Sequence, residues 1–211
     1  MICAIVLAAG ESRRMGTQKL LLPFGDATVV THVVEQLLRS LANQIYVVVG
    51  HQRERIVGEL SGLPVSIIEN ADYKAGMLSS VRCGLRALPE GCEAALIALG
   101  DQPALTSTLV SEMVQAFAGT DKGILVPTHQ GKRGHPLLFS TQYRDEILTR
   151  YDDVGLRGLL HAHPEDILQF HVPTTAVLSD MDYPEDYRRE TDLFGAVAPE
   201  IKPTLRRLPE I

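Results

Sequence analysis

The stretch VLAAGESRRMGTQKLLLPFG, residues 6–25, decides the fold. It begins as an apolar strand, turns through small residues, becomes apolar again and carries three cations in the turn, Arg13, Arg14 and Lys19. Open α/β sheets bind ligands where a strand ends in a glycine-containing loop, since backbone N–H groups and cations there can hold phosphate oxygens. The stretch therefore predicts a polyphosphate site. The alternative is a solvated basic loop.

The loop does not fit two common phosphate motifs. The spacing of Gly10, Gly16 and Lys19 differs from G-x-x-x-x-G-K-[ST], which excludes a P-loop, and no G-x-G-x-x-G follows the strand, which weakens a dinucleotide site. Small residues let a ligand approach the backbone. We expect this loop to supply part of the nucleotide-binding set: Leu7, Ala8, Ala9, Gly10, Arg13 and Gly16.

Composition narrows the class of protein. The chain has 211 residues, 45% of them hydrophobic, and a formal net charge of −6. The acidic balance argues against a general nucleic-acid binder, so the cations suggest a small anionic ligand. No apolar run approaches the ~20 residues of a membrane span, and the first residues lack the basic start of a signal peptide. The three cysteines lack C-x-x-C spacing, and we expect reduced packing thiols in a cytoplasmic protein.

Apolar runs alternate with amphipathic stretches along the first part of the chain. We expect strands at 2–8, 44–50, 64–70, 93–100 and 123–127, and helices at 28–40, 53–60, 79–88 and 106–118. This alternation predicts a single-domain α/β fold, a mostly parallel Rossmann-like sheet with helices on both faces. After residue 127 the pattern changes to antiparallel or irregular strands, one of them at 167–172, and then a helix that opens at Pro184.

We therefore expect one domain over residues 1–191, followed by a tail over 192–211. Within the domain, 1–127 forms a nucleotide-binding half and 128–191 an acceptor-side half. The tail holds prolines and mixed charge.

Five motifs in order resemble one family. The opening loop is followed by NADYKAGMLSSVRCGL (70–85), ALGDQP (98–103), GKRGHPLLF (131–139) and DMDYPEDY (180–187). Together they are similar to the MobA-like NTP transferases that load a nucleotide onto molybdopterin, and most similar to the molybdenum cofactor cytidylyltransferase type. The resemblance spans residues 1–190 and implies a GT-A-like nucleotidyltransferase that moves CMP from CTP to the terminal phosphate of molybdopterin and releases pyrophosphate.

The acidic residues suggest a metal. Asp101 directly follows a strand, so it lies at the same edge of a parallel sheet as the basic loop. A carboxylate that faces phosphates needs a cation between them, and Mg²⁺ takes one or two carboxylates together with phosphate oxygens. Asp180 and Asp182 share a face of an extended stretch. Helix or turn capping is the alternative for each, but the resemblance favours Asp101 with Asp182 as metal ligands.

The remaining motifs suggest how the two substrates are recognised. By resemblance, Gly76, Ser79 and Ser80 lie against the base, with N-capping by Ser79 as the alternative. Alanines at positions 8 and 9, where guanylyl-loading relatives carry L-A-G-G, favour CTP over GTP. Arg133 and His135 suit the anionic acceptor.

We expect Arg14, Lys19 and Asp101 to be catalytic. A phosphate monoester is largely dianionic at neutral pH and needs no general base. The alternatives are the same chemistry with GTP or on another phosphorylated small molecule, and a non-catalytic maturation factor that binds the pterin. The resemblance implies as partners a xanthine dehydrogenase-type molybdoenzyme or its chaperone, and neither nucleic acid nor membrane.

Overall fold

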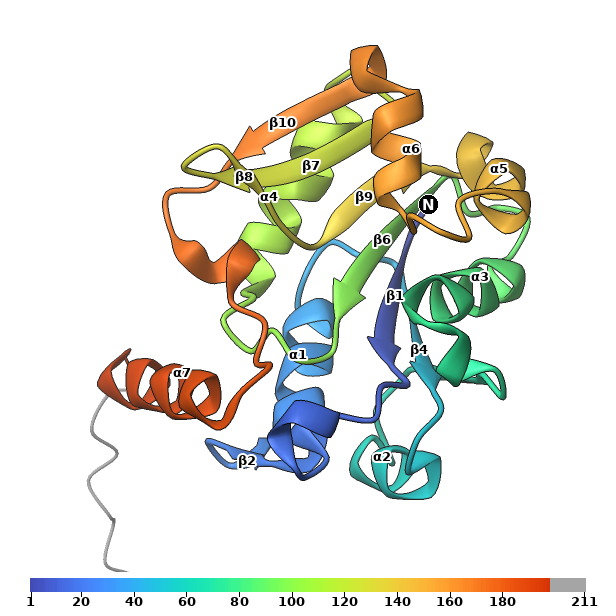
Figure 1. Ribbon diagram of the computed structural model, residues 1–211. Helices are drawn as coiled ribbons and strands as arrows, with labels where there is room; N and C mark the ends of the chain where they lie inside the picture. Colours follow the sequence, from blue (N-terminus) through green and yellow to red (C-terminus); the bar gives the residue numbers. More distant parts are fainter. Residues whose placement is uncertain (198–211) are drawn as a thin grey trace, which may run out of the picture.

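The computed structural model describes residues 1–197, which fold around one mostly parallel sheet (Figure 1). Its strand order is β10-β7-β9-β6-β1-β4-β5, with β8 paired to β7. Five strands of this sheet come from the nucleotide-binding half, namely β1 (Ile2–Ala8), β4 (Gln44–Val49), β5 (Ser66–Glu69), β6 (Ala94–Leu99) and β7 (Ile124–His129). The central strands are apolar on both faces because helices cover both sides, and residues 3–6 of β1 are fully buried.

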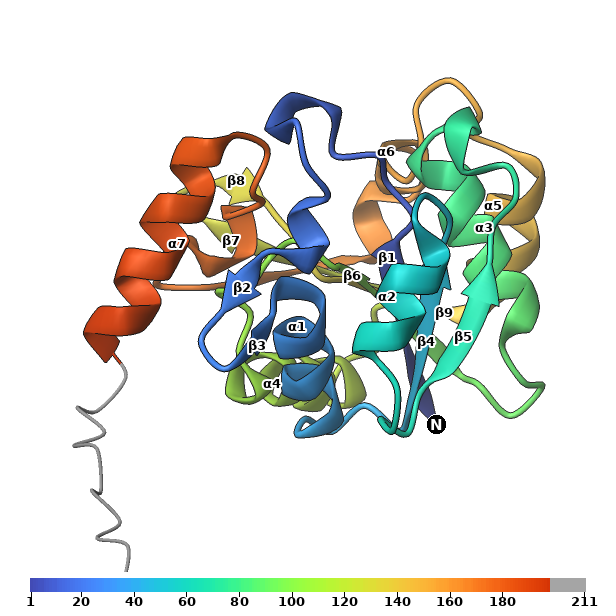
Figure 2. The same ribbon diagram turned by 90° about the horizontal axis from the view of Figure 1, so that it is seen from below.

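Two layers of helices enclose the sheet, as Figure 2 shows. One face packs against α1 (Val29–Leu38), α2 (Arg53–Glu59) and α4 (Ser107–Ala118). The other face packs against α3 (Met77–Ala87), α5 (Arg144–Thr149) and α6 (Arg157–Ala162). The predicted α/β architecture is therefore confirmed.

The second half of the chain completes the same sheet. Strand β9 (Leu137–Ser140) is antiparallel to both β6 and β7 and lies between them, and β8 (Lys132–Arg133) is antiparallel to β7. Strand β10 (Ile167–His171) is parallel to β7. Antiparallel strands follow residue 127 as expected, but the strand expected at 167–172 is parallel to its neighbour and is neither antiparallel nor irregular. Strand β9 pairs with β6 and with β7, so one sheet continues from the first expected half into the second.

The last described helix, α7 (Pro184–Val197), lies at one side of the molecule beside the β2–β3 hairpin, Pro23–Phe24 and Ala27–Thr28 (Figure 1). It opens at Pro184 as expected, but it continues past residue 192, where composition suggested the tail. The rest of the tail, 198–211, lies outside the described residues. The ring of Phe194 packs 4.6 Å from that of Phe24, which anchors α7.

Within residues 1–197 no helix is both long and apolar enough to cross a bilayer. The three cysteines are free thiols, as expected.

Candidate active site

The opening loop and Asp101 leave the sheet at the same edge. Strands β1 and β6 are parallel neighbours, with Leu7 paired to Leu99, so the segments that follow them emerge side by side. A cavity of about 540 Å³ lies at this edge. Its lining comes from the opening loop, from the start of α3, from the end of β6 and from the segment before α7.

Lys19 joins two carboxylates at this cavity. Its ammonium group pairs with the Oδ2 atom of Asp101 and lies 3.2 Å from Oδ1 of Asp182. The side chains of Lys19 and Asp101 are each only 14% exposed. Arg14 places Nη1 2.6 Å from the other oxygen of Asp182. The chain thus brings together residues from its first loop, its middle and its end, as the motifs predict.

Burial and charge act in opposite directions on this pair. Burial alone would lower the pKa of Lys19, but the neighbouring carboxylates of Asp101 and Asp182 outweigh it and raise that pKa. Lys19 therefore stays protonated. Burial raises the pKa of Asp101, and the ammonium of Lys19 opposes this shift.

A buried glutamine that the sequence analysis missed holds the loop in shape. Gln18 is 3% exposed, and its Nε2 donates to the Gly10 carbonyl at 3.0 Å. Its Oε1 accepts from the Ser12 hydroxyl at 2.7 Å, and the same hydroxyl oxygen accepts from the Lys19 N–H at 3.2 Å. The loop is thus ordered by its own polar groups. No local pattern marks this role, because the bonds form only once the chain has turned.

Most of the residues predicted for the nucleotide, for catalysis and for the metal line this cavity, and three do not. The lining includes Leu7, Ala9, Gly10, Arg13, Arg14, Lys19, Gly76, Ser80, Asp101, Asp180 and Asp182. Ala8 instead packs in the core at 1% exposed, because alternate residues of β1 face the helices α1 and α2. Gly16 ends the first 3₁₀ turn with φ of 69° and lies outside the lining.

The third is Ser79, and the interpretation of Ser79 as an N-cap is wrong. Helix α3 begins at Met77, after Gly76, whose φ is 101°. The hydroxyl of Ser79 lies inside the first turn, where it donates to the carbonyls of Asp72 at 3.0 Å and Gly76 at 2.8 Å. The Nδ2 of Asn70 donates to Ser79, and also to Ser80, which does line the cavity.

Tyr73 and Lys74 line the cavity but were not singled out. Both lie in the 3₁₀ turn Tyr73–Ala75 before α3. Lys74 is a cation two residues before Gly76, and a cation near a glycine of a loop is the signal that drew attention to Lys19.

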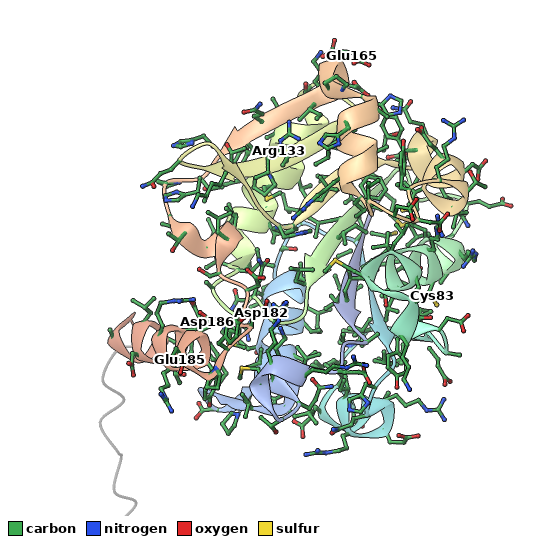
Figure 3. All side chains as sticks on the ribbon, viewed as in Figure 1. Cys83, Arg133, Glu165, Asp182, Glu185 and Asp186 are labelled. Atoms are coloured by element: carbon green, nitrogen blue, oxygen red, sulfur yellow. The ribbon has the colours of Figure 1, made fainter. Side chains whose placement is uncertain are left out.

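A second cavity of about 680 Å³ adjoins the first. Met77, Leu99 and Asp180 line both, so the two cavities share a border. Arg133 and His135, the expected acceptor residues, line the second one. In Figure 3, Asp182 lies near the start of α7, whereas Arg133, which belongs to β8, lies higher in the view.

His135 is held close to the chain that carries Val177. Its N–H donates to the Val177 carbonyl at 2.9 Å. The preceding residue has to be glycine, because a Cβ at Gly134 would overlap that carbonyl. The Nδ1 atom of His135 is buried and has no hydrogen-bond partner in the described structure. Burial lowers the pKa of this imidazole, so it is neutral at physiological pH.

The donor set suits a metal that shares its shell with a substrate. Within residues 1–197 no three His, Cys, Asp or Glu side chains come together as a self-sufficient metal site. The carboxylates of Asp101 and Asp182 both pair with the ammonium of Lys19, and all three residues line the first cavity. Two carboxylates plus phosphate oxygens and water are what Mg²⁺ requires, so the residues fit a metal that arrives with a polyphosphate.

Comparisons with known proteins agree with this geometry. Residues 4–167 match the MobA-like NTP transferase domain. The chain is 27% identical over 190 residues to the molybdenum cofactor cytidylyltransferase of Escherichia coli K12, which covers 88% of this chain and 93% of that protein. It is 31% identical over 160 residues to a probable molybdenum cofactor guanylyltransferase of Mycobacterium ulcerans, covering 74% of this chain and 75% of that protein.

Among solved structures, Rv0371c from Mycobacterium tuberculosis H37Rv, in complex with manganese, superposes with a TM-score of 0.77 at 24% identity, covering 90% of this chain and 98% of that one. This likeness supports the fold. Asp101 lies inside the domain match and Asp182 lies beyond its end.

Proposed function

The chain belongs to the MobA-like NTP transferase family, and from this premise we propose that it transfers CMP from CTP to the terminal phosphate of molybdopterin and releases pyrophosphate. The observation that carries the proposal is the meeting of Lys19, Asp101 and Asp182 at the cavity beside the opening loop. Cations and carboxylates together at the carboxyl edge of a parallel sheet suit a nucleoside triphosphate and its metal.

The cations of the loop bind and neutralise phosphate. Lys19 is buried and charged, so it is a fixed positive group where charge grows on the departing pyrophosphate. The exposed guanidiniums of Arg13 and Arg14 can turn to the triphosphate. The acceptor phosphate is itself the nucleophile and is already dianionic, so no side chain has to remove a proton. Catalysis then consists of positioning and charge neutralisation.

Asp101 and Asp182 would hold the divalent metal, which we propose to be Mg²⁺. When bound, it supplies charge neutralisation on the triphosphate oxygens. The same carboxylates pair with Lys19, so holding a metal would weaken part of that pairing. The solved relative from M. tuberculosis contains manganese, which is consistent with a divalent ion in this fold.

The second cavity is proposed to receive the acceptor. It adjoins the first cavity at Asp180, so a phosphate entering from it would reach the α-phosphorus of a bound nucleotide. Arg133 supplies a cation and His135 a neutral imidazole. We further propose that the product passes in the cytoplasm to a xanthine dehydrogenase-type molybdoenzyme or its chaperone.

GTP is the second candidate nucleotide. The relative from M. ulcerans is named a guanylyltransferase, while the relative from E. coli is named a cytidylyltransferase. Ala8 and Ala9 favour CTP. Because Ala8 faces the core, any influence of position 8 on the base acts through the path of the loop.

Pyrophosphate release tests the proposal. The protein is incubated with Mg²⁺, molybdopterin and either CTP or GTP, and phosphorylated sugars replace molybdopterin in parallel reactions. We expect release with CTP and molybdopterin. Release with GTP and molybdopterin, but not with CTP and molybdopterin, would change the assigned nucleotide. Release only when a sugar phosphate replaces molybdopterin would change the assigned acceptor. Binding of molybdopterin with no release from any mixture would indicate a non-catalytic carrier.

A further inference from the structure

Helix α6 presents two polar side chains, one of them a guanidinium, to the second cavity. Arg157 and His161, one turn apart, line it together with Leu156 and Leu160. Leu160 is 8% exposed, whereas Arg157 is exposed to solvent. The helix therefore buries its leucines as the apolar wall and leaves its polar side chains at the opening. Neither Arg157 nor His161 has a part in the motifs that mark the nucleotide site.

The arginines of this cavity lack acidic partners. Within residues 1–197, no carboxylate pairs with Arg157 or Arg133, whereas Lys19 and Arg14 in the first cavity are both paired. The only acidic side chain in the lining of the second cavity is Asp180, at the border with the first. In a chain of net charge −6, two unpaired guanidiniums facing one cavity indicate an anionic ligand.

Apart from Gln102 and His135, the rest of the lining is apolar. Its floor is formed by buried side chains of α3, β9 and the last 3₁₀ turn, namely Val81, Leu137 and Val177. A ligand that fits both features has an apolar ring body and a phosphate group. Arg157 and His135 line the same cavity.

We propose that Arg157 is a binding residue for the phosphate of the acceptor, acting opposite Arg133. This inference rests on the proposed function and adds to it the group that selects a phosphomonoester. A guanidinium on α6 and another on β8 approach the cavity from different elements, so they can contact a phosphate from two sides. Arg157 sets acceptor affinity, and the nucleotide site remains complete without it.

The experiment compares wild type with Arg157→Gln, Arg157→Lys and the control Arg55→Gln, an arginine on α2 that lines neither cavity. Steady-state pyrophosphate release gives KM for molybdopterin and for the nucleotide. Losing a charged hydrogen-bond pair should raise the molybdopterin KM of Arg157→Gln about ten-fold or more. The molybdopterin KM of Arg157→Lys should lie between those of wild type and Arg157→Gln, and the KM of the control should match that of wild type. The nucleotide KM should not change.

Two further measurements distinguish a failure of the role of Arg157 from a failure of the proposed function. Melting temperature with and without CTP and Mg²⁺ verifies that each variant folds and keeps the nucleotide site. Equilibrium dialysis with molybdopterin in the absence of nucleotide measures acceptor binding directly. Transfer by wild type together with an unchanged molybdopterin KM in Arg157→Gln would overturn the role of Arg157 and leave the function standing. Absence of transfer by wild type would overturn the function, and dialysis would then decide on Arg157: weaker binding by the variant supports the role, and equal or absent binding rejects it.

Discussion

The ammonium nitrogen of Lys19 lies 3.2 Å from Oδ1 of Asp182, which ties the first loop of the chain to the segment that leads into α7. The same nitrogen pairs with Asp101 after β6. One buried cation thus organises carboxylates from two distant parts of the sequence. Its removal would leave Asp101 without a counter-charge in a largely buried position.

Lys19→Ala should lower the turnover number about 10²-fold or more, because a fixed charge that faces the leaving pyrophosphate is lost. Pyrophosphate release under saturating substrates measures this. Lys122→Ala is a matched control, since Lys122 lines neither cavity and its ammonium donates to the carbonyl of Glu165 at 2.8 Å. A wild-type rate in Lys19→Ala would remove the lysine from the mechanism.

The three aspartates at the first cavity should differ in their effect on metal dependence. Asp101→Asn and Asp182→Asn should each raise the Mg²⁺ concentration that gives half-maximal turnover, because each carboxylate removed weakens a hard-cation site. Asp180→Asn, which keeps the size of the side chain, should leave that concentration near the wild-type value. The reverse pattern for Asp180 and Asp182 would assign the second ligand to Asp180.

Much of the fold was predictable because its strands are apolar runs separated by amphipathic segments. β1 and β6 are buried on both faces, and such strands have an unmistakable composition. The position of β9 between β6 and β7 was not predictable. A short strand pairs wherever the folded sheet offers an open edge, and nothing within its own four residues specifies that edge.

The site residues that could be predicted lie in segments that leave the carboxyl ends of strands. Lys19 and Asp101 are of this kind, and the structure brings them together. Gln18 was missed because its hydrogen bonds to Ser12 and Gly10 form only once the loop has turned. The start of α3 was misjudged because serine is a favoured N-cap, yet Gly76 with its positive φ is the N-cap, and the helix begins at Met77, two residues before the first serine.

Arg82 should act as a positioning residue for the second cavity. Its side chain, 16% exposed, donates to the carbonyls of Ile147 at 2.8 Å and Arg150 at 2.6 Å and pairs with Asp152 at 2.5 Å. These bonds fasten the segment before α6 to α3. Arg82→Ala should raise the molybdopterin KM while the melting-temperature shift caused by CTP and Mg²⁺ stays the same, because only the acceptor wall loosens.

The same variant should lose about 1–3 kcal/mol of unfolding free energy, since two carbonyls lose their donor. Urea unfolding measures the loss. Arg82→Lys restores charge without the three-way geometry, so it should recover little of the acceptor affinity. Full recovery by lysine would show that charge alone, and not the fork of the guanidinium, holds the segment.

Glu146 should make the stability of the folded protein depend on pH in the acidic range. The hydroxyl of Tyr151 donates to its carboxylate, and the Nε2 of His163 lies 3.0 Å from it. The Tyr151 hydrogen bond is the largest cause holding the pKa of Glu146 below its usual range. Burial raises the pKa of Tyr151 to about 12, so this donor keeps its proton across the working range.

A carboxyl whose pKa is lower in the folded state stabilises the protein fully above its unfolded pKa, and this stability is lost as pH falls through the folded value. The melting-temperature advantage of wild type over Glu146→Gln should therefore shrink as pH is lowered from about 6 to about 3. Tyr151→Phe removes the donor and should lose most of the same pH dependence. A difference between wild type and Glu146→Gln that stays constant over this range would contradict the role.

Gly158 should be required because the ring of Tyr151 packs directly on it. Tyr151 itself has φ of 77°, and a Cβ at Gly158 would overlap its ring. Gly158→Ala should cost about 1–3 kcal/mol of unfolding free energy, because the ring and the wall of the second cavity must shift. Gly58→Ala on α2, where nothing lies within 4 Å, is the matched helical control and should stabilise by about 0.4–1 kcal/mol. Equal changes in unfolding free energy for the two substitutions, measured by urea unfolding, would show that the Tyr151 ring moves aside without cost.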